Sequence, residues 1–283
     1  MKALLLYSNK TGKNKAIKLH DKIVKKLSSK YEITSKECPS LDEFKEAVDS
    51  SKDFDCLFIL GGDGTLNNAI NVVARLPLEK RPTIGYIPTG TLNDAGKTFG
   101  IKGINKAIKI ILEGNKEDID ICSFNDSYFL YLAAVGQYSD ISYSAKRDEK
   151  KRVGKMSYYR LSVIEAFQKY NIHIEVEYDG VKEEYVTPFI IVMNGKYVGG
   201  FKINPKKSIN DEMFDVYITK PGMFNGLVHY FPFKTKTKHI HTNKLTVSVK
   251  GDDFWCLDGE KATQGKATIE CLPAYITMFT LKR

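Results

Sequence analysis

The chain has 283 residues, of which 42% are hydrophobic and 27% are charged, which is typical of a soluble globular protein of one or two domains. The 43 basic and 34 acidic residues give a formal net charge of +9, which favours an anionic partner. No apolar run approaches the length of a bilayer span, the apolar start is too short for a signal peptide, and the five cysteines never form a C-x-x-C pair. We therefore expect a cytoplasmic protein with reduced thiols and no zinc site.

The first 124 residues alternate between short apolar runs and segments in which apolar residues recur at helical spacing. The pattern predicts strands at 2–7, 31–34, 55–60 and 83–87, and helices at about 14–28, 41–48, 66–74 and 104–112. Regular alternation of strand and helix indicates a doubly wound parallel sheet, whose ligands bind at the carboxyl ends of the strands.

The glycine-rich stretch 61–65 follows one of these buried strands and precedes a helix. Glycines let a backbone approach a phosphate closely, and a helix N-terminus offers free N–H groups to it. An ordinary strand-to-helix turn is the alternative interpretation. Asp63 favours a phosphate site that uses Mg²⁺, because a carboxylate in an anion cradle is repulsive unless it holds a metal ion or a donor. The polar loops 8–13 and 88–94 are expected at the same edge of the sheet.

Beyond about residue 125 the pattern changes to strands with hairpin turns, interrupted by one predicted helix at 156–170. We expect strands at 128–135, 173–178, 181–185, 189–194, 214–219, 245–250, 254–257, 266–271 and 275–281. These predict a mostly antiparallel sandwich, so the chain divides into an α/β domain at 1–124 and a β-sandwich domain at 125–283.

Basic residues gather at 146–152 and at Lys234, Lys236 and Lys238, the latter beside two phenylalanines. Such runs are most often solvated faces, but interleaved aromatic residues also suit contact with an anionic membrane surface. No nucleic-acid recognition motif accompanies them, so we expect no nucleic-acid partner.

Four motifs together resemble a known family: Gly61–Asn67, Gly90–Asp94, Met193–Gly200 and Leu257–Glu260. Their order and spacing, over nearly the whole chain, are similar to the catalytic domain of diacylglycerol kinases, sphingosine kinases and soluble bacterial lipid kinases. The resemblance favours the short bacterial diacylglycerol kinases. It implies an α/β nucleotide-binding domain, a C-terminal β-sandwich for the lipid, and an active site in the cleft between them.

The resemblance also assigns roles to residues. Asp63 and Asp94 resemble the carboxylates that organise Mg²⁺ and ATP, Glu260 the base that accepts the lipid hydroxyl proton, and Asp120 the aspartate that partners this base. The residues that resemble nucleotide contacts are Asn9, Lys13, Thr34, Gly61, Gly62, Asp63, Gly64, Thr65, Leu66, Asn67 and Thr91.

A second Mg²⁺ site, structural in bacterial members, is implied at Asp211 with the backbone carbonyls of Ser208 and Met213. Two positions depart from the family pattern. The usual Asn-Pro after the first strand is Asn9-Lys10 here, and Glu212 stands where the family has a glycine.

We expect transfer of the γ-phosphate of ATP to diacylglycerol, giving phosphatidic acid. Another lipid alcohol, of the phosphatidylglycerol or sphingoid type, remains an alternative acceptor, and a homodimer remains open. Kinases of soluble molecules, such as NAD kinases and phosphofructokinases, share the glycine motif but do not pair 90–94 with 258–260 in this way. A binding module without catalysis would lack a carboxylate, whereas Asp63, Asp94 and Glu260 are all present.

Overall fold

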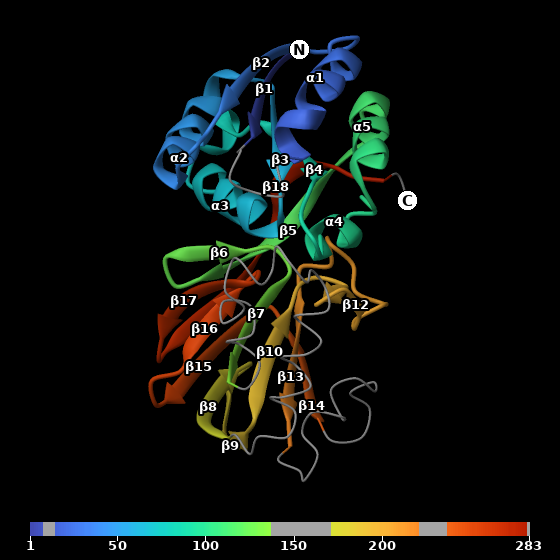
Figure 1. The fold of residues 1–283 in the computed structure, drawn as a ribbon. Helices are drawn as coiled ribbons and strands as arrows, with labels where there is room; N and C mark the ends of the chain where they lie inside the picture. The colour runs from blue at the N-terminus through green and yellow to red at the C-terminus, as the bar shows by residue number, and fades with distance from the viewer. Residues whose placement is uncertain (8–14, 137–170, 221–236, 282–283) are drawn as a thin grey trace. The chain divides into compact units, whose positions relative to one another are not determined.

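The computed structural model describes residues 1–7, 15–136, 171–220 and 237–281, and the chain divides into two compact units (Figure 1). The first unit comprises Met1–Asp120 and the C-terminal segment from Pro273, and the second comprises Ile121–Leu272. The division therefore falls slightly before the expected boundary at 124/125. The end of the chain, from Pro273, was expected in the sandwich but belongs to the first unit.

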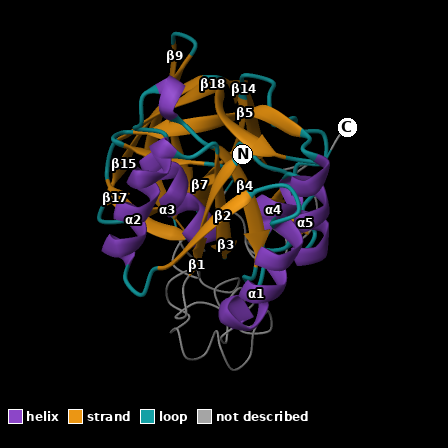
Figure 2. Ribbon diagram, turned by 90° about the horizontal axis from the view of Figure 1, so that it is seen from above, coloured by secondary structure: helices purple, strands orange, loops and turns teal. Residues whose placement is uncertain are grey.

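The first unit is built on a parallel sheet. Its strand order is β2-β1-β3-β4, and the sheet is extended by the end of β18, where Met278 lies opposite Ile84. Helices α2 and α3 lie on one side of this sheet and α1, α4 and α5 on the other (Figure 2), which confirms the doubly wound class. The elements are β1 (Lys2–Tyr7), α1 (Lys15–Leu27), β2 (Glu32–Glu37), α2 (Leu41–Asp49), the 3₁₀ turn η1 (Ser50–Asp53), β3 (Cys56–Gly61), α3 (Asp63–Val73), the 3₁₀ turn η2 (Leu78–Lys80), β4 (Thr83–Pro88), α4 (Asp94–Thr98) and α5 (Ile104–Glu113). Strand β5 (Lys116–Phe124) begins in this unit and continues past Asp120 into the second.

The sequence explains this arrangement locally. Every residue of β3 and β4 is buried, as expected for central parallel strands that are covered by helices on both faces. Ser40 caps α2, because its hydroxyl accepts a hydrogen bond from the Glu43 N–H. Helix α5 ends at Gly114, whose φ of 80° is readily available to glycine.

The second unit is a sandwich of antiparallel strands, as predicted. One sheet has the order β14-β13-β10-β7-β16-β17, and the other contains β18-β15-β8-β9. Their shared core includes Trp255, Phe124 and Phe214, all fully or almost fully buried. The elements are β6 (Ser127–Phe129), β7 (Leu132–Gly136), β8 (Ile172–Tyr178), β9 (Val181–Thr187), β10 (Phe189–Met193), β11 (Tyr197–Val198), β12 (Phe201–Lys202), β13 (Phe214–Thr219), β14 (Thr237–Thr242), β15 (Lys244–Lys250), β16 (Phe254–Leu257), β17 (Glu260–Gln264) and β18 (Ala267–Phe279).

Several expected elements differ from the structure. The strands expected at 266–271 and 275–281 are one strand, β18, which passes through Pro273 and Ala274. Ala274 has a φ of 47°, so the apparent break is a local irregularity within a continuous strand. The strand expected at 128–135 is divided into β6 and β7, whereas α4 and β14 were not expected. The helix expected at 156–170 and the basic stretch 146–152 lie outside the described residues, as do Lys234 and Lys236.

Candidate active site

The glycine motif is a tighter turn than the sequence suggests. Strand β3 ends at Gly61, Gly62 is the N-cap of α3, and the helix begins at Asp63 rather than at the expected residue 66. Asp63, Gly64 and Thr65 thus form the first helical turn, and the first helical hydrogen bond runs from the Leu66 N–H to the Gly62 carbonyl. N–H groups in a first turn have no acceptor within the helix, and the helix dipole favours a negative charge there.

Two of the glycines allow close packing, Gly61 against the Thr65 side chain and Gly90 against the backbone of the other turn. A Cβ atom on Gly61 would lie 2.6 Å from the Thr65 Cβ, inside the turn. A Cβ on Gly90 would lie 3.0 Å from the Gly62 Cα and 2.7 Å from the Asn93 Oδ1. The turns after β3 and β4 therefore touch through backbone atoms, as their register predicts, since Gly61 pairs with Pro88.

Asp63 connects these two turns. Its Oδ2 accepts the Asp94 N–H at 3.0 Å and its Oδ1 accepts the Ala95 N–H at 3.2 Å, so the carboxylate lies at the N-terminus of α4. Burial, followed by the charge of Asp63, raises the pKa of Tyr86 well above its usual value, and the Tyr86 hydroxyl lies 3.5 Å from the Asp63 Oδ1. The sequence predicted Asp63 as a metal-organising carboxylate but not as the group that joins the turns.

Asp94 lies at the start of α4 with a side chain that is almost fully buried. Its Oδ1 is 3.2 Å from the Lys97 Nζ, so a cation on the same helix balances its charge. Thr91 precedes it on the exposed part of the turn. Asp63, Asp94 and the two glycine turns are thus brought together, as expected from strand order.

Other expected nucleotide contacts differ in position. Leu66 is fully buried, so only its backbone is available, and Asn67 is 8% exposed with its Oδ1 accepting from the Asn71 side chain. Thr34 pairs with Leu4, which pairs with Leu57. Thr34 is therefore level with a position four residues before Gly61, about 13 Å along the strand at about 3.3 Å per residue. Asn9 and Lys13 lie outside the described residues.

The motif Leu257–Glu260 forms a two-residue hairpin between β16 and β17. Leu257 pairs with Glu260, and Asp258 and Gly259 have φ angles of 50° and 91°. Positive φ at both central residues defines the type I′ turn that Asp-Gly favours. Glu260 is consequently the first residue of β17, and it is exposed.

Asp258 has a structural role that sequence reasoning missed. Its side chain is buried, and it accepts the backbone N–H groups of Leu130 at 2.7 Å, Tyr131 at 2.9 Å and Leu132 at 3.0 Å. This carboxylate holds the bend between β6 and β7 against the hairpin that carries Glu260. The Asp-Gly pair signalled the turn, but no local pattern signalled these distant partners.

Asp120, the expected partner of Glu260, is 3% exposed and belongs to the first unit. Its Oδ1 accepts the Ala274 N–H at 2.9 Å, next to the irregular point in β18. Glu260 belongs to the second unit. Their partnership remains a prediction.

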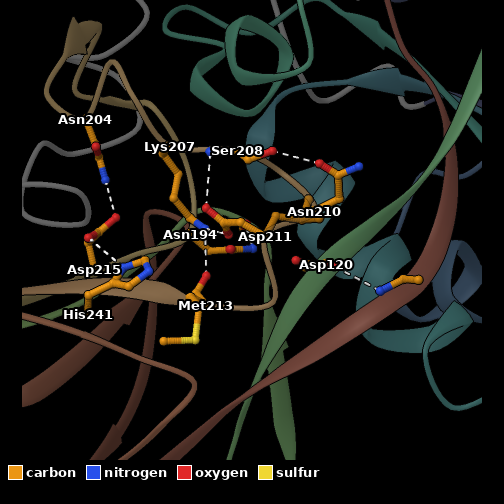
Figure 3. Close-up of polar contacts among 12 residues, drawn as sticks. Asp120, Asn194, Asn204, Lys207, Ser208, Asn210, Asp211, Met213, Asp215 and His241 are labelled. Atoms are coloured by element: carbon orange, nitrogen blue, oxygen red, sulfur yellow. Dashed lines mark hydrogen bonds and ion pairs between the residues drawn. The ribbon is translucent and has the colours of Figure 1, made fainter.

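The expected structural metal site contains a lysine (Figure 3). The Lys207 Nζ donates to the Asp211 Oδ1 and, at 2.6 Å, to the Met213 carbonyl, which are two of the three predicted metal ligands. The Ser208 N–H donates to the Asp211 Oδ2 at 3.3 Å. Within the described parts of the chain, no three His, Cys, Asp or Glu side chains form a group that could hold a metal ion.

Comparisons with known proteins agree with this architecture. Residues 2–124 match the model of the diacylglycerol kinase catalytic domain, and residues 134–280 match that of the YegS C-terminal NAD kinase beta sandwich-like domain. A diacylglycerol kinase of Staphylococcus carnosus is 30% identical over 99% of this chain and 95% of its own length. One of Bacillus subtilis is 32% identical over 74% of this chain and 72% of its own.

A solved structure of a diacylglycerol kinase from Bacillus anthracis has a TM-score of 0.84 and 25% identity, covering 99% of this chain and 97% of that one. Among the residues that the structure describes, no helix is long and apolar enough to span a membrane.

Proposed function

Because the chain belongs to the diacylglycerol kinase catalytic domain family, and is therefore a kinase with an alcohol acceptor, we propose that it transfers the γ-phosphate of ATP to diacylglycerol. The product would be phosphatidic acid. The observation that carries the proposal is the contact between the two glycine turns, bridged by the Asp63 carboxylate at the start of two helices. Phosphoryl transfer needs this kind of site, since it depends on positioning and charge neutralisation rather than on covalent chemistry.

The first turn of α3 would bind the nucleotide phosphates through its N–H groups. Asp63 and Asp94 would hold the divalent metal that neutralises phosphate charge when ATP is bound. Asp63 fits this role, because its carboxylate lies where the two glycine turns meet, at the N-terminus of α4. The Lys97 ammonium, 3.2 Å from Asp94, balances the charge of that buried carboxylate and orients it.

Glu260 would act as the general base. A lipid hydroxyl is a weak nucleophile until its proton is accepted, and general-base catalysis typically contributes about 10²–10⁴ in rate. The hydroxyl proton would pass to Glu260 as the oxygen bonds to the γ-phosphorus and ADP leaves. Glu260 is exposed at the start of β17, and Asp258 fixes its hairpin, which supports this assignment. Asp120 is proposed to orient this base.

The acceptor resides in a membrane, so the enzyme must reach its surface. The net charge of +9 supports peripheral contact with anionic lipid, to which each juxtamembrane Lys or Arg contributes about 1 kcal/mol.

A screen with γ-labelled ATP tests the proposal. The acceptors would be diacylglycerol, phosphatidylglycerol and sphingosine in mixed micelles, with NAD and fructose 6-phosphate as soluble alternatives. We expect labelled phosphatidic acid as the main product. Labelling of NAD or fructose 6-phosphate in preference to every lipid would contradict a lipid acceptor.

A further inference from the structure

Lys207 lies on the loop between β12 and β13, and its side chain has no exposed surface. Its ammonium group donates to the Asp211 carboxylate and to the Met213 carbonyl (Figure 3). Asp211 is partly exposed. Lys206, the residue before Lys207, is exposed. A buried ammonium group is stable only when it is paired and hydrogen-bonded. The Lys207 ammonium group is therefore part of the hydrogen bonding within this loop.

The oxygens that surround Lys207 largely coincide with those that the family resemblance assigns to a structural Mg²⁺. Mg²⁺ requires about six oxygens in an octahedron at about 2.0–2.1 Å. An ammonium group within hydrogen-bonding distance of two of the assigned oxygens occupies the space between them, and its positive charge repels a second cation. The residues present therefore do not fit a divalent ion as they stand.

The loop is also fastened by its own polar groups. The Ser208 N–H donates to the second oxygen of Asp211, and the Asn204 side chain donates to the Asp215 Oδ2 at 2.6 Å. Glu212 keeps a φ of 62°, the left-handed conformation that glycine adopts more easily. Glu212 thus adopts the backbone conformation that a glycine at this position would favour.

We propose that the ammonium group of Lys207 replaces the structural divalent cation in this protein. It supplies one positive charge against the single charge of Asp211, and it bridges the carboxylate to the Met213 carbonyl. The β12–β13 loop is then organised by the chain itself, and its stability is independent of Mg²⁺. The proposal concerns the loop and does not depend on which lipid is phosphorylated.

Thermal unfolding of the nucleotide-free, full-length protein tests this proposal. For the wild type, we expect the same melting temperature in EDTA and in millimolar Mg²⁺. K207A should melt roughly 6 °C or more below the wild type in EDTA, because removing one partner of a buried ion pair leaves the other uncompensated. Mg²⁺ should raise the melting temperature of K207A, since the vacated oxygens again suit a cation. K206A, the matched control on the exposed neighbour, should melt as the wild type does under both conditions.

Three results would overturn the proposal: stabilisation of the wild type by Mg²⁺, equal melting of K207A and K206A in EDTA, or no effect of Mg²⁺ on K207A. If K207A does not fold in EDTA, the melting temperatures of the wild type in EDTA and in Mg²⁺ still show whether Mg²⁺ stabilises it. Refolding of K207A with and without Mg²⁺ then shows whether the metal can take the place of the ammonium group.

Discussion

Replacing Asp258 with asparagine should destabilise the second unit strongly while keeping the hairpin conformation. Asparagine tolerates the positive φ of this position, so the turn itself remains favourable. In the wild type, the Leu130 N–H donates to one carboxylate oxygen at 2.7 Å, and the Tyr131 and Leu132 N–H groups donate to the other. The amide of D258N keeps one acceptor oxygen for Tyr131 and Leu132, but its NH₂ group would face the Leu130 N–H.

The magnitude follows from these three bonds. Leaving a buried donor unsatisfied costs about 1–3 kcal/mol, and each charge-assisted bond that becomes neutral loses roughly half of its 1.5–3 kcal/mol. The sum is about 2.5–6 kcal/mol, which corresponds to a fall of roughly 10 °C in the melting temperature of a unit of this size. Hydrogen exchange should accelerate at the amides of Leu130, Tyr131 and Leu132 in particular.

The assay is thermal unfolding of D258N beside D252N, a control that makes the same change at an exposed aspartate on the preceding turn. D252N should melt close to the wild type. If D258N melts within about 2 °C of the wild type, Asp258 does not anchor the β6–β7 bend and this energetic reasoning is wrong.

Two further predictions concern the first unit. Burial raises the pKa of Tyr31 from 10.0 to about 12, so the folded protein holds this proton more tightly than the unfolded chain does. Stability from this group is complete below pH 10 and falls between pH 10 and 12, by at most about 3 kcal/mol. The free energy of unfolding, measured by denaturant titration, should fall less steeply with pH for Y31F than for the wild type over that range. Parallel pH dependence of the two proteins would show that Tyr31 does not have the raised pKa. In the glycine turns, G90A should lower the melting temperature because its Cβ meets the Gly62 backbone, whereas G62A should fold normally, since its Cβ would make only an ordinary contact at 3.6 Å. Both variants are compared in the same thermal melts. An equal fall in melting temperature for G62A and G90A would show that the contact between the Gly90 and Gly62 backbones does not require glycine at position 90 in particular.

The sequence predicted the parts of this protein that depend on local patterns. Apolar runs located β3 and β4, and the parallel order that they imply was enough to bring the turns at Gly61 and Gly90 to one edge. Asp179-Gly180 signalled the β8–β9 hairpin, whose φ angles of 47° and 76° match the expected turn.

Features that depend on distant partners were missed. Asp258 binds backbone groups more than 120 positions away along the chain, so no window around it could reveal the bond. The continuity of β18 was hidden by Pro273, which reads locally as a strand break although the strand continues beyond it. Lys207 was overlooked because a lysine beside other polar residues looks exposed, and only the folded loop shows that its side chain is buried.

The most direct test of the central claim compares the wild type with E260Q, using γ-labelled ATP and diacylglycerol in mixed micelles. Glutamine keeps the size of the side chain and cannot accept the hydroxyl proton. We predict that turnover to phosphatidic acid falls by about 10²–10⁴, or roughly 3–5 kcal/mol of transition-state stabilisation, while ATP affinity and melting temperature stay close to those of the wild type. Near-normal turnover in E260Q would show that Glu260 is not the base, and loss of ATP affinity together with turnover would assign it to the nucleotide site instead.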